Sequence, residues 1–374
     1  MRILFTFIGG SGHFRPLIPV ARAVEAAGHI VAVAGSGNVT SEVRAAGFQA
    51  FATSEPRTGP QEPVPPLEPL DPELEDRVLR DGFARSGARR HAAAILGIAR
   101  TWRPDVVVRD EVDFGSAIAA DVLGLPIATV LVLAAGSFLR KELVAEPMAE
   151  LRSEHGLAPD PDLAMLDGDL VLSPFPPSFR SPAYPLPANA FSFRPGNAIP
   201  RQAASNPPTV YFTFGTVPYD PGVFQRVLGG LASLPVKVVA TVGAHADPAS
   251  FGSQPDHVRL ERFVPQELLL PRCDLVVSHA GSGSVIGALE HGLPSILLPM
   301  GADQAHNTQR CLELRTALEL DPVSVSPSEV ARSVMAVLET PAYRRNAERI
   351  QDEMNALPGV EHTMPLLEGL VRPG

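Results

Sequence analysis

The sequence predicts an α/β protein of two domains, each built around a doubly wound parallel sheet. Short β-branched runs alternate with helical patterns through both halves of the chain, and this alternation is typical of parallel α/β sheets. The length of 374 residues suits two domains of ordinary size. Residues 174–208 contain ten prolines and lie midway along the chain, so we expect the domains to be connected there.

The expected strands and helices follow one another in a regular order. In the first half we expect strands at 2–8, 29–35, 105–109 and 127–133 and helices at 16–27, 86–101 and 115–123. In the second half we expect strands at 209–215, 236–242, 258–264, 274–279 and 295–300 and helices at 222–233, 283–291, 303–315, 327–339 and 342–356. Seven prolines in residues 55–72 indicate a long loop over the first domain. The chain thus divides into an N-terminal domain (1–195), a linker (196–207), a C-terminal domain (208–355) and a tail (356–374) that returns to the N-terminal domain.

Composition excludes several classes of protein. A formal net charge of -10 argues against a nucleic-acid or anionic-membrane partner, which would require a basic patch. Two cysteines without a C-x-x-C pair argue against a disulfide framework or a zinc site and fit the cytoplasm. The most apolar interior run, residues 123–136, is too short to span a membrane and contains Pro126, so we expect no stable membrane insertion. Twenty-nine arginines against two lysines suggest a GC-rich bacterial genome.

The first glycine-rich corner, "GGSGHFRP" at residues 9–16, does not fit a dinucleotide-binding loop. A G-x-G-x-x-G motif starting at Gly10 would end at Arg15 instead of glycine. The second strand also ends in "AGSG" without the acidic residue that holds a ribose. Because no G-x-x-x-x-G-K-[ST] motif occurs, a P-loop kinase is excluded as well.

Two further glycine corners lie in the second half, at Gly215–Thr216 and in "SHAGSGSVIGALEHGLP" at residues 278–294. In doubly wound sheets the ligand crevice lies beyond the carboxyl ends of the strands, where the strand order reverses. The first and fourth strands flank that point, which brings Gly215 and Thr216 beside His279 and the small residues that follow. Their amides and hydroxyls could surround a diphosphate. Alternatively, these glycines only permit close packing of strand and helix.

The same geometry brings His13 beside Asp110 in the first half. A histidine whose partner is a carboxylate suits a general base that takes a proton from an alcohol. Glu111 and Asp113 are close enough in sequence to compete with Asp110 for this role. His13 could also be an ordinary loop histidine.

Taken in order, these residues resemble the antibiotic-type glycosyltransferases of family one, which have the GT-B fold and modify macrolides, enediynes and aromatic polyketides. The resemblance spans nearly the whole chain. It rests on "GHFRPLIPVARAVEAAGH" (12–29), "RPDVVVRD" (103–110), "FTFGT" (212–216) and "RFVPQELLLPRCDLVVSHAGSGSVIGALEHGLPSILLPMGADQ" (262–304). It implies two Rossmann-like domains facing a cleft, with the acceptor on the first and a nucleotide sugar on the second.

The resemblance also implies roles for particular residues. His13 would be the catalytic base and Asp110 its partner. The donor would be bound by Gly12, Gly215, Thr216, Arg262, Phe263, Val264, His279, Gly281, Ser282, Gly283, Ser284, Asp303 and Gln304, although Asp303 could simply be a helix N-cap. The acceptor would contact Phe14, Phe83 and Phe138, which could equally be core residues. Departure of the diphosphate would need no metal, because helix amides and His279 can stabilise its charge. We expect no metal role for the D-x-D patterns at 160–162 and 167–169.

Two departures from the family pattern refine the expected function. Relatives with uridine donors carry a glutamate eight residues after the counterpart of His279, where it binds both ribose hydroxyls; here that position is Gly287. Losing this carboxylate suits a deoxyribose, and hence a dTDP-deoxysugar. The usual glycine turn is also missing from residues 311–320, which brings the following strand into question.

We therefore expect an inverting, metal-independent O-glycosyltransferase without a cofactor, monomeric or homodimeric, acting on a natural-product aglycone. C-transfer remains open, as do a nucleotide-sugar 2-epimerase of the same fold and a non-catalytic partner of another glycosyltransferase.

Overall fold

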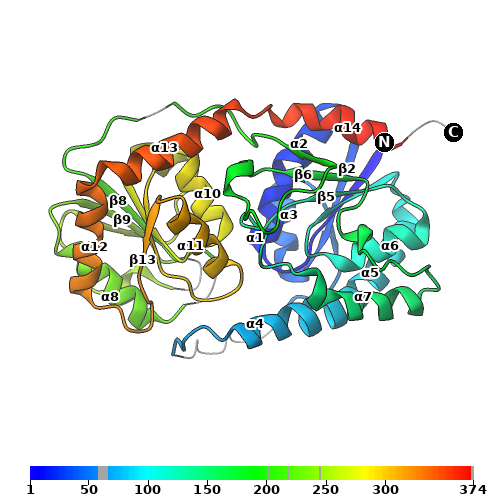
Figure 1. The fold of residues 1–374 in the computed structure, drawn as a ribbon, viewed down its shortest axis with the longest axis horizontal. Coiled ribbons are helices and arrows are strands. Elements are labelled where there is room, and N and C mark those ends of the chain that lie inside the picture. Colours follow the sequence, from blue (N-terminus) through cyan, green and yellow to red (C-terminus); the bar gives the residue numbers. More distant parts are fainter. Residues whose placement is uncertain (58–65, 201, 217–218, 244–245, 372–374) are drawn as a thin grey trace.

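The computed structural model describes the chain except residues 58–65, 201, 217–218, 244–245 and 372–374. Parts of the proline-rich loop at 55–72, of the linker and of the C-terminal tail therefore lie outside the described residues. Two α/β domains lie side by side, each with a central sheet between layers of helices (Figure 1). The predicted fold class is confirmed.

Each domain contains one parallel sheet. The N-terminal sheet has the order β3-β2-β1-β4-β5-β6-β7, and the C-terminal sheet has the order β10-β9-β8-β11-β12-β13. The N-terminal strands are β1 (Arg2–Thr6), β2 (Ile30–Gly35), β3 (Gln49–Ala52), β4 (Val106–Asp110), β5 (Ile127–Val130), β6 (Leu170–Ser173) and β7 (Ala190–Ser192). The C-terminal strands are β8 (Thr209–Thr213), β9 (Lys237–Thr241), β10 (Val258–Glu261), β11 (Leu275–Ser278), β12 (Ser295–Leu297) and β13 (Ala317–Glu319). In each sheet the order reverses between the first and fourth strands, which is the switch point where such folds bind ligands.

The helices connect these strands in sequence order. In the N-terminal domain they are α1 (Ser11–Phe14), α2 (Ile18–Ala26), α3 (Thr40–Ala45), α4 (Pro72–Arg77), α5 (Ala88–Trp102), α6 (Phe114–Leu123) and α7 (Lys141–Glu154). In the C-terminal domain they are α8 (Pro221–Ala232), α9 (Gln266–Leu269), α10 (Ser282–Glu290), α11 (Gln304–Glu313), α12 (Pro327–Glu339) and α13 (Pro341–Ala356), and the chain continues into α14 (Thr363–Leu370). Among the described residues no helix is both long and apolar enough to cross a bilayer.

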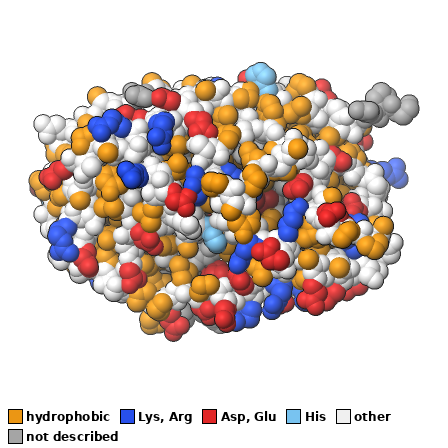
Figure 2. Space-filling model, in the orientation of Figure 1, with side chains coloured by type: hydrophobic (Ala, Val, Ile, Leu, Met, Phe, Trp, Pro, Cys, Tyr) orange, Lys and Arg blue, Asp and Glu red, His pale blue; other side chains and the backbone are white. Residues whose placement is uncertain are grey.

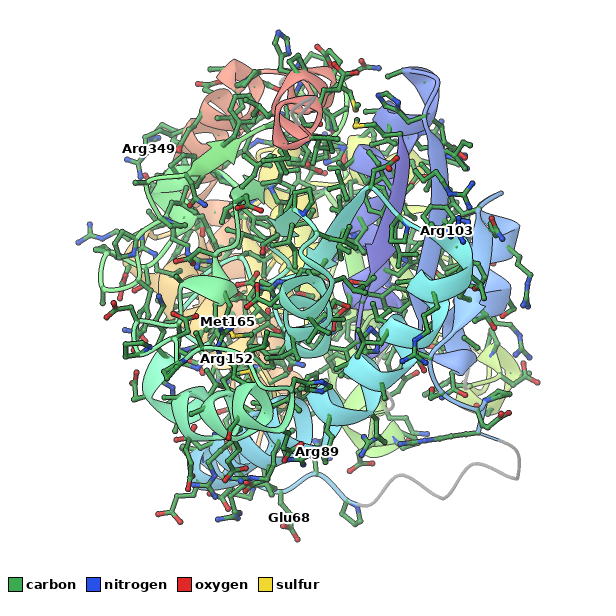
Figure 3. All side chains as sticks on the ribbon, turned by 90° about the vertical axis from the view of Figure 1, so that its right-hand side faces the viewer. Glu68, Arg89, Arg103, Arg152, Met165 and Arg349 are labelled. Carbon is green, nitrogen blue, oxygen red and sulfur yellow. The ribbon has the colours of Figure 1, made fainter. Side chains whose placement is uncertain are left out.

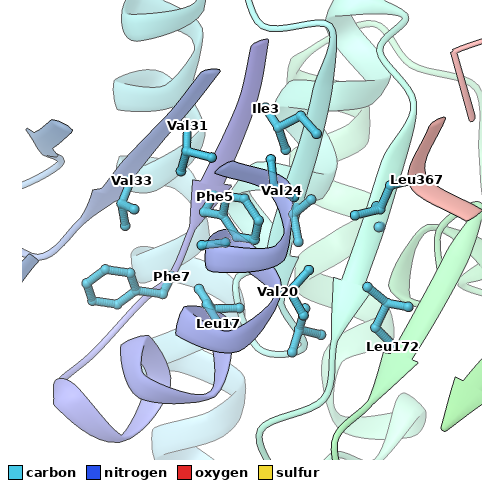
Figure 4. Close-up of a cluster of buried hydrophobic side chains, with 14 of the residues drawn as sticks. Ile3, Phe5, Phe7, Leu17, Val20, Val24, Val31, Val33, Leu172 and Leu367 are labelled. Atoms are coloured by element: carbon cyan, nitrogen blue, oxygen red, sulfur yellow. The ribbon is translucent and has the colours of Figure 1, made fainter. Parts of the chain in front are cut away.

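The cores form because alternate residues of each strand face opposite helical layers. On β1, Ile3 and Phe5 pack with α2 and with Leu367 of α14, as Figure 4 shows. Leu4 points the other way, toward α5 and α6. The C-terminal sheet repeats this arrangement: Phe212 packs with α8 and α12, and Tyr211 with α9 and α10. At the surface, acidic and basic side chains are intermingled over the face seen in Figure 2.

Several elements were not expected from the sequence. Strands β3, β6 and β7 are only three or four residues long. Helix α7 contains Pro147 in its interior, where proline normally breaks a helix. It is held to the domain by Arg152, whose Nη1 lies 2.5 Å from Asp121 Oδ2 and 3.5 Å from Met165 Sδ, and Figure 3 shows Arg152 and Met165 next to each other.

The stretch 311–320 forms its helix end and strand without a glycine turn. Arg315 adopts the left-handed conformation (φ 53°) that glycine usually takes after a helix. Its amide donates to Leu312 O (3.0 Å), and the Thr316 amide donates to Cys311 O (2.9 Å), which is the hydrogen-bond pattern of a Schellman cap. Strand β13 then pairs with β12. The strand that the missing glycine turn brought into question is therefore formed.

Candidate active site

The switch points of both sheets bring the predicted residues together. In the N-terminal sheet Thr6 is in register with Arg109, so the loops after β1 and β4 lie at the same edge. In the C-terminal sheet Thr213 is in register with Ser278, which places Gly215 next to His279.

His13 and Asp110 form a pair in the N-terminal crevice. His13 Nδ1 lies 3.3 Å from Asp110 Oδ2, with the imidazole 24% exposed and the carboxylate fully buried. Asp110 is fixed by two backbone amides, those of Ile8 (2.9 Å) and Val112 (2.7 Å). The ring of Phe83 stacks on the imidazole at a centroid distance of 6.3 Å. The base candidate is thus oriented from two sides and still reaches solvent.

The charges around His13 raise its pKa above the ordinary value. Burial is the largest single effect and lowers the pKa, but the Asp110 carboxylate, together with Asp303 and Glu111, raises it by more in total. Asp303 belongs to the C-terminal domain, so its effect on His13 indicates that the two crevices face each other. A histidine in this environment is a stronger base than a free imidazole.

The two acidic residues that could have competed with Asp110 have other partners. Glu111 Oε2 accepts hydrogen bonds from the amides of Val132 (2.5 Å) and Leu133 (2.8 Å). Asp113 caps α6 through the Ser116 amide and lies 3.1 Å from His91 Nε2. Burial raises the pKa of Asp113, but its ion pair with His91 prevails and lowers it to about 2. Asp110 is therefore the partner that the structure gives to His13.

His279, in the C-terminal crevice, has no carboxylate partner among the residues that the structure describes. Burial lowers its pKa to about 4, so the ring is neutral at physiological pH. Two glycines hold the ring: a Cβ on Gly215 would lie 2.7 Å from its Cε1, and one on Gly281 would lie 2.5 Å from its Nε2. At these two positions glycine is required by the close approach of the His279 ring, rather than by packing of a strand against a helix. Gly283 differs, because a Cβ there would meet open space.

The first turn of α10 presents the amides expected to meet a diphosphate. Gly281 is its N-cap residue, and Ser282, Gly283 and Ser284 form the first turn. The amide of Ser284 donates back to Gly281 O at 2.9 Å, so part of this turn is satisfied internally. The preceding residue, Ala280, has a left-handed backbone (φ 66°), which is uncommon without glycine and typical of strained functional loops.

The Asp303–Gln304 pair begins α11 opposite this turn. Asp303 Oδ2 accepts hydrogen bonds from Ser282 Oγ (2.6 Å) and Asn307 Nδ2 (2.8 Å) and does not cap its own helix. Gln304 Oε1 accepts from the amide of Met300 (2.7 Å). Ser282 is expected to bind the donor through its backbone amide; its hydroxyl bonds to Asp303 and to the Ala134 amide of the N-terminal domain.

The remaining donor candidates lie in segments that follow strands of the two sheets. Phe263 is 64% exposed in the loop after β10, flanked by Arg262 and Val264. Thr216 is exposed beyond β8, and a Cβ on Gly12 would meet open space. Gly287 faces α9: a Cβ there would lie 3.2 Å from Gln266 Oε1, so a larger side chain at position 287 would displace Gln266.

The three aromatic acceptor candidates separate into two groups. Phe83 contacts His13, and Phe138 packs edge-on against His306 of the C-terminal domain at 5.9 Å. Phe14 is a core residue, in contrast to its expected contact with the acceptor. It is fully buried against Phe7 and Phe48, because the first turn after β1 directs it into the core.

Several polar residues of the cleft were missed from the sequence. Ser137 Oγ lies 2.9 Å from His306 Nδ1 across the domains, and Asn307 is completely buried between them. Glu75 of α4 accepts a hydrogen bond from the Ala302 backbone. The one signal available was the helical spacing that places His306 and Asn307 one turn after Asp303.

Aspartates of the two D-x-D patterns accept hydrogen bonds from backbone amides. Asp160 accepts from the amides of Ala164 and Met165, both at 2.9 Å, and Asp169 accepts from the amide of Ile127 at 2.9 Å. Across the described ranges no three histidine, cysteine, aspartate or glutamate side chains gather in a way that suits a metal ion.

Comparisons with known proteins agree on the kind of enzyme. The family model "Erythromycin biosynthesis protein CIII-like, C-terminal domain" matches residues 225–370. The 3-alpha-mycarosylerythronolide B desosaminyl transferase of Saccharopolyspora erythraea is 26% identical, with 99% of this chain and 98% of the relative covered. The aclacinomycin-T 2-deoxy-L-fucose transferase of Streptomyces galilaeus is 27% identical, with 99% and 96% covered.

Solved structures show the same fold over the full length. The spinosyn rhamnosyltransferase SpnG complexed with thymidine diphosphate superimposes with a TM-score of 0.80 at 21% identity, covering 98% of this chain and all of the other. The glycosyltransferase VinC in complex with dTDP gives a TM-score of 0.77 at 24% identity, covering both chains completely. The chain is thus a glycosyltransferase with the GT-B fold, similar over its full length to transferases of antibiotic and natural-product biosynthesis.

Proposed function

We propose that this enzyme transfers a deoxysugar from a dTDP-sugar to a hydroxyl group of a natural-product aglycone, with inversion at the anomeric carbon. The observation that carries the proposal is a pair of histidines with opposite pKa shifts, one after a switch-point strand of each sheet. His13, beside Asp110, is set to accept a proton. His279, neutral and beside the first turn of α10, is set to contact a leaving group without adding charge.

In the proposed reaction His13 takes the proton of the acceptor hydroxyl as its oxygen attacks the anomeric carbon. The bond from that carbon to the β-phosphate oxygen breaks, and its electron pair leaves with the diphosphate. Asp110 stabilises the imidazolium that forms. Attack from the side opposite the leaving group inverts the configuration.

The diphosphate gains charge as it departs, and the start of α10 is the element suited to receive it. Helix N-terminal amides and the positive end of the helix dipole stabilise an anion. These groups are already oriented, because the His279 ring is wedged between Gly215 and Gly281. We therefore propose that the charge is stabilised by the protein without a metal, so EDTA should leave the rate unaltered.

A thymidine nucleotide is favoured by the surroundings of Gly287. The position faces Gln266 and offers no carboxylate for a second ribose hydroxyl. Two proteins of similar fold, VinC and SpnG, were solved in complex with thymidine diphosphate. A nucleotide-sugar 2-epimerase is disfavoured, because its reaction has no use for a base facing an acceptor. The intact Schellman cap at Arg315 removes the main reason to consider a non-catalytic partner.

Titration calorimetry with dTDP and UDP tests the donor assignment. We expect dTDP to bind at least about tenfold more tightly, a difference of about 1.4 kcal/mol. Equal affinities would remove the argument from Gly287. The double variant Gly287→Glu/Gln266→Ala, which makes room for the carboxylate, should shift the preference toward UDP, whereas Gln266→Ala alone should not.

A further inference from the structure

A loop of the N-terminal domain, residues 131–138, is hydrogen-bonded to the donor side of the C-terminal domain. The amide of Ala134 donates to Ser282 Oγ (2.9 Å), and the amide of Ala135 donates to Asn307 Oδ1 (3.2 Å). Ser137 Oγ adds a contact to His306 Nδ1 (2.9 Å). Three contacts, from residues 134, 135 and 137, thus join one loop of the N-terminal domain to the first turns of α10 and α11.

The same loop is tied to the catalytic base on its other side. Glu111 holds the amides of Val132 and Leu133, which immediately precede the interdomain contacts. Glu111 directly follows Asp110, the partner of His13. The position of the loop is therefore linked, through two adjacent residues, to the carboxylate that orients the base.

On the donor side the network converges on Asp303. Ser282 Oγ and Asn307 Nδ2 both donate to its Oδ2, and Asn307 Nδ2 also lies 3.0 Å from Ala280 O. Asn307 is completely buried and Ser282 is 9% exposed. The Ser282 hydroxyl accepts a hydrogen bond from the N-terminal domain and donates one to Asp303. Asn307 accepts from the N-terminal domain through Oδ1 and donates to Asp303 through Nδ2.

Simple adhesion between the domains does not require this arrangement. Helix α11 is already fastened to the N-terminal domain by Arg310, which donates to Phe179 O (3.1 Å) and Ser178 O (2.8 Å). An apolar interface would hold two domains together at least as well as a buried polar network. The polar groups of Ser282 and Asn307 instead fix the carboxylate of one residue, Asp303.

We propose that Ser282 and Asn307 are positioning residues that orient Asp303 toward the donor sugar when loop 131–138 is docked. The contact of Asp303 with the sugar and the orientation of the base then both depend on one set of interdomain hydrogen bonds. We call this set the latch; it consists of Ala134, Ala135, Ser282, Asp303 and Asn307. This inference rests on the proposed function, because it assigns the sugar to the surroundings of Asp303.

The variant Asn307→Asp tests the latch most sharply. It keeps an oxygen for the Ala135 amide but replaces the donor to Asp303 with a second carboxylate. We expect the affinity for dTDP alone to stay within about twofold, whereas binding of dTDP-glucose relative to dTDP weakens about tenfold at neutral pH. At lower pH the two carboxylates share a proton, which restores a hydrogen bond and the relative affinity for dTDP-glucose. A merely structural defect would not recover in acid.

Ser282→Ala provides an independent variant that removes one donor to Asp303 without adding charge. It should weaken dTDP-glucose relative to dTDP at all pH values. Gln309→Ala is the matched control, since Gln309 lies on the exposed face of α11, where its side chain donates to Glu313 of the same helix. Small-angle scattering of the free proteins should show a larger radius of gyration for Asn307→Asp and Ser282→Ala than for the parent and the control.

The outcomes separate the latch from the proposed function. If the parent protein binds dTDP and both latch variants match the control in relative affinity and in scattering, the latch is wrong and the donor assignment stands. Loss of dTDP and dTDP-glucose binding in parallel would also overturn it, because the defect would then lie in the nucleotide site. If the parent binds no dTDP, the proposed donor is wrong, and scattering alone decides whether Ser282 and Asn307 hold the domains together.

Discussion

The two halves of the molecule carry a histidine at corresponding edges of similar sheets, yet the two rings are chemically opposite. His13 follows the first strand of its domain, and His279 follows the fourth strand of the other, each at the point where strand order reverses. His13 is partly exposed and lies 3.3 Å from a buried carboxylate. His279 is buried between two glycines without any such partner.

One carboxylate accounts for most of this difference. Both rings are disfavoured as cations by burial, but only His13 has an anion close enough to reverse the effect. The N-terminal crevice thereby contains a candidate base, and the C-terminal crevice contains a neutral imidazole beside the first turn of α10. The architecture is repeated, and the chemistry depends on which side chain follows one strand.

The largest expected effect comes from removing the base. His13→Ala should lower the transfer rate by about 10²- to 10⁴-fold, the usual contribution of general base catalysis. The affinity for dTDP should be unchanged, because the proposed nucleotide site lies on the other domain. Single-turnover kinetics and calorimetry measure the two quantities. Turnover within a few-fold of the parent would show that His13 is not the base.

The second prediction concerns the stability contributed by His279. Its pKa is about 4 in the folded protein, against 6.5 for a free histidine. The unfolded chain therefore binds a proton at higher pH than the folded one, and the free energy of unfolding should fall by about 3 kcal/mol as pH drops from about 6.5 to about 4. His13 and His91, whose pKa values are raised, act in the opposite direction.

Comparing the parent with His279→Asn isolates this contribution, since the other histidines are common to both. Urea unfolding across that pH range should show the additional acid sensitivity in the parent only. Identical pH dependence in the two proteins would mean that the ring is not held neutral.

Asp110→Asn makes the N-terminal crevice more like the C-terminal one. Since His13 must be unprotonated to act as a base, activity should fall as pH decreases through its raised pKa. Without the carboxylate that pKa falls, so the acid limb of kcat/KM should move to lower pH. The maximal rate should fall about tenfold to hundredfold, because the imidazolium loses a charged partner. If the acid limb of the kcat/KM profile does not move, it reflects the titration of a group other than His13.

Much of this contrast was accessible from the sequence because it depends on local patterns. Strand–glycine–histidine and strand–aspartate junctions mark the carboxyl ends of strands, and sheet topology then places His13 beside Asp110 and Gly215 beside His279. The long strands and amphipathic helices followed from periodicity for the same reason.

What the sequence did not predict depends on tertiary context. Strands β3, β6 and β7 are too short to show a period, and α7 carries Pro147 in its interior. Arg315 replaces the glycine that signals a helix end. The sequence could not show that Phe14 is buried in the core, because an aromatic side chain is common both in ligand pockets and in cores. The interdomain bonds of Ser282 and Asn307 join segments about 150 to 170 residues apart, for which no spacing rule exists.

The smallest expected effect tests how His279 is held. Gly281 has an ordinary backbone conformation (φ -61°, ψ 146°), so Gly281→Ala introduces no backbone strain. Its new Cβ would lie 2.5 Å from His279 Nε2, and Gly215 blocks the ring from retreating on the other side. The ring or the start of α10 must therefore shift, and we expect dTDP to bind about tenfold more weakly, a loss of about 1.4 kcal/mol. Gly229→Ala in α8 is the matched control, because a Cβ there meets only an ordinary contact 3.9 Å away. If both variants bind dTDP like the parent, packing against the glycines does not set the donor site, and the contrast between the two histidines would reduce to their charge alone.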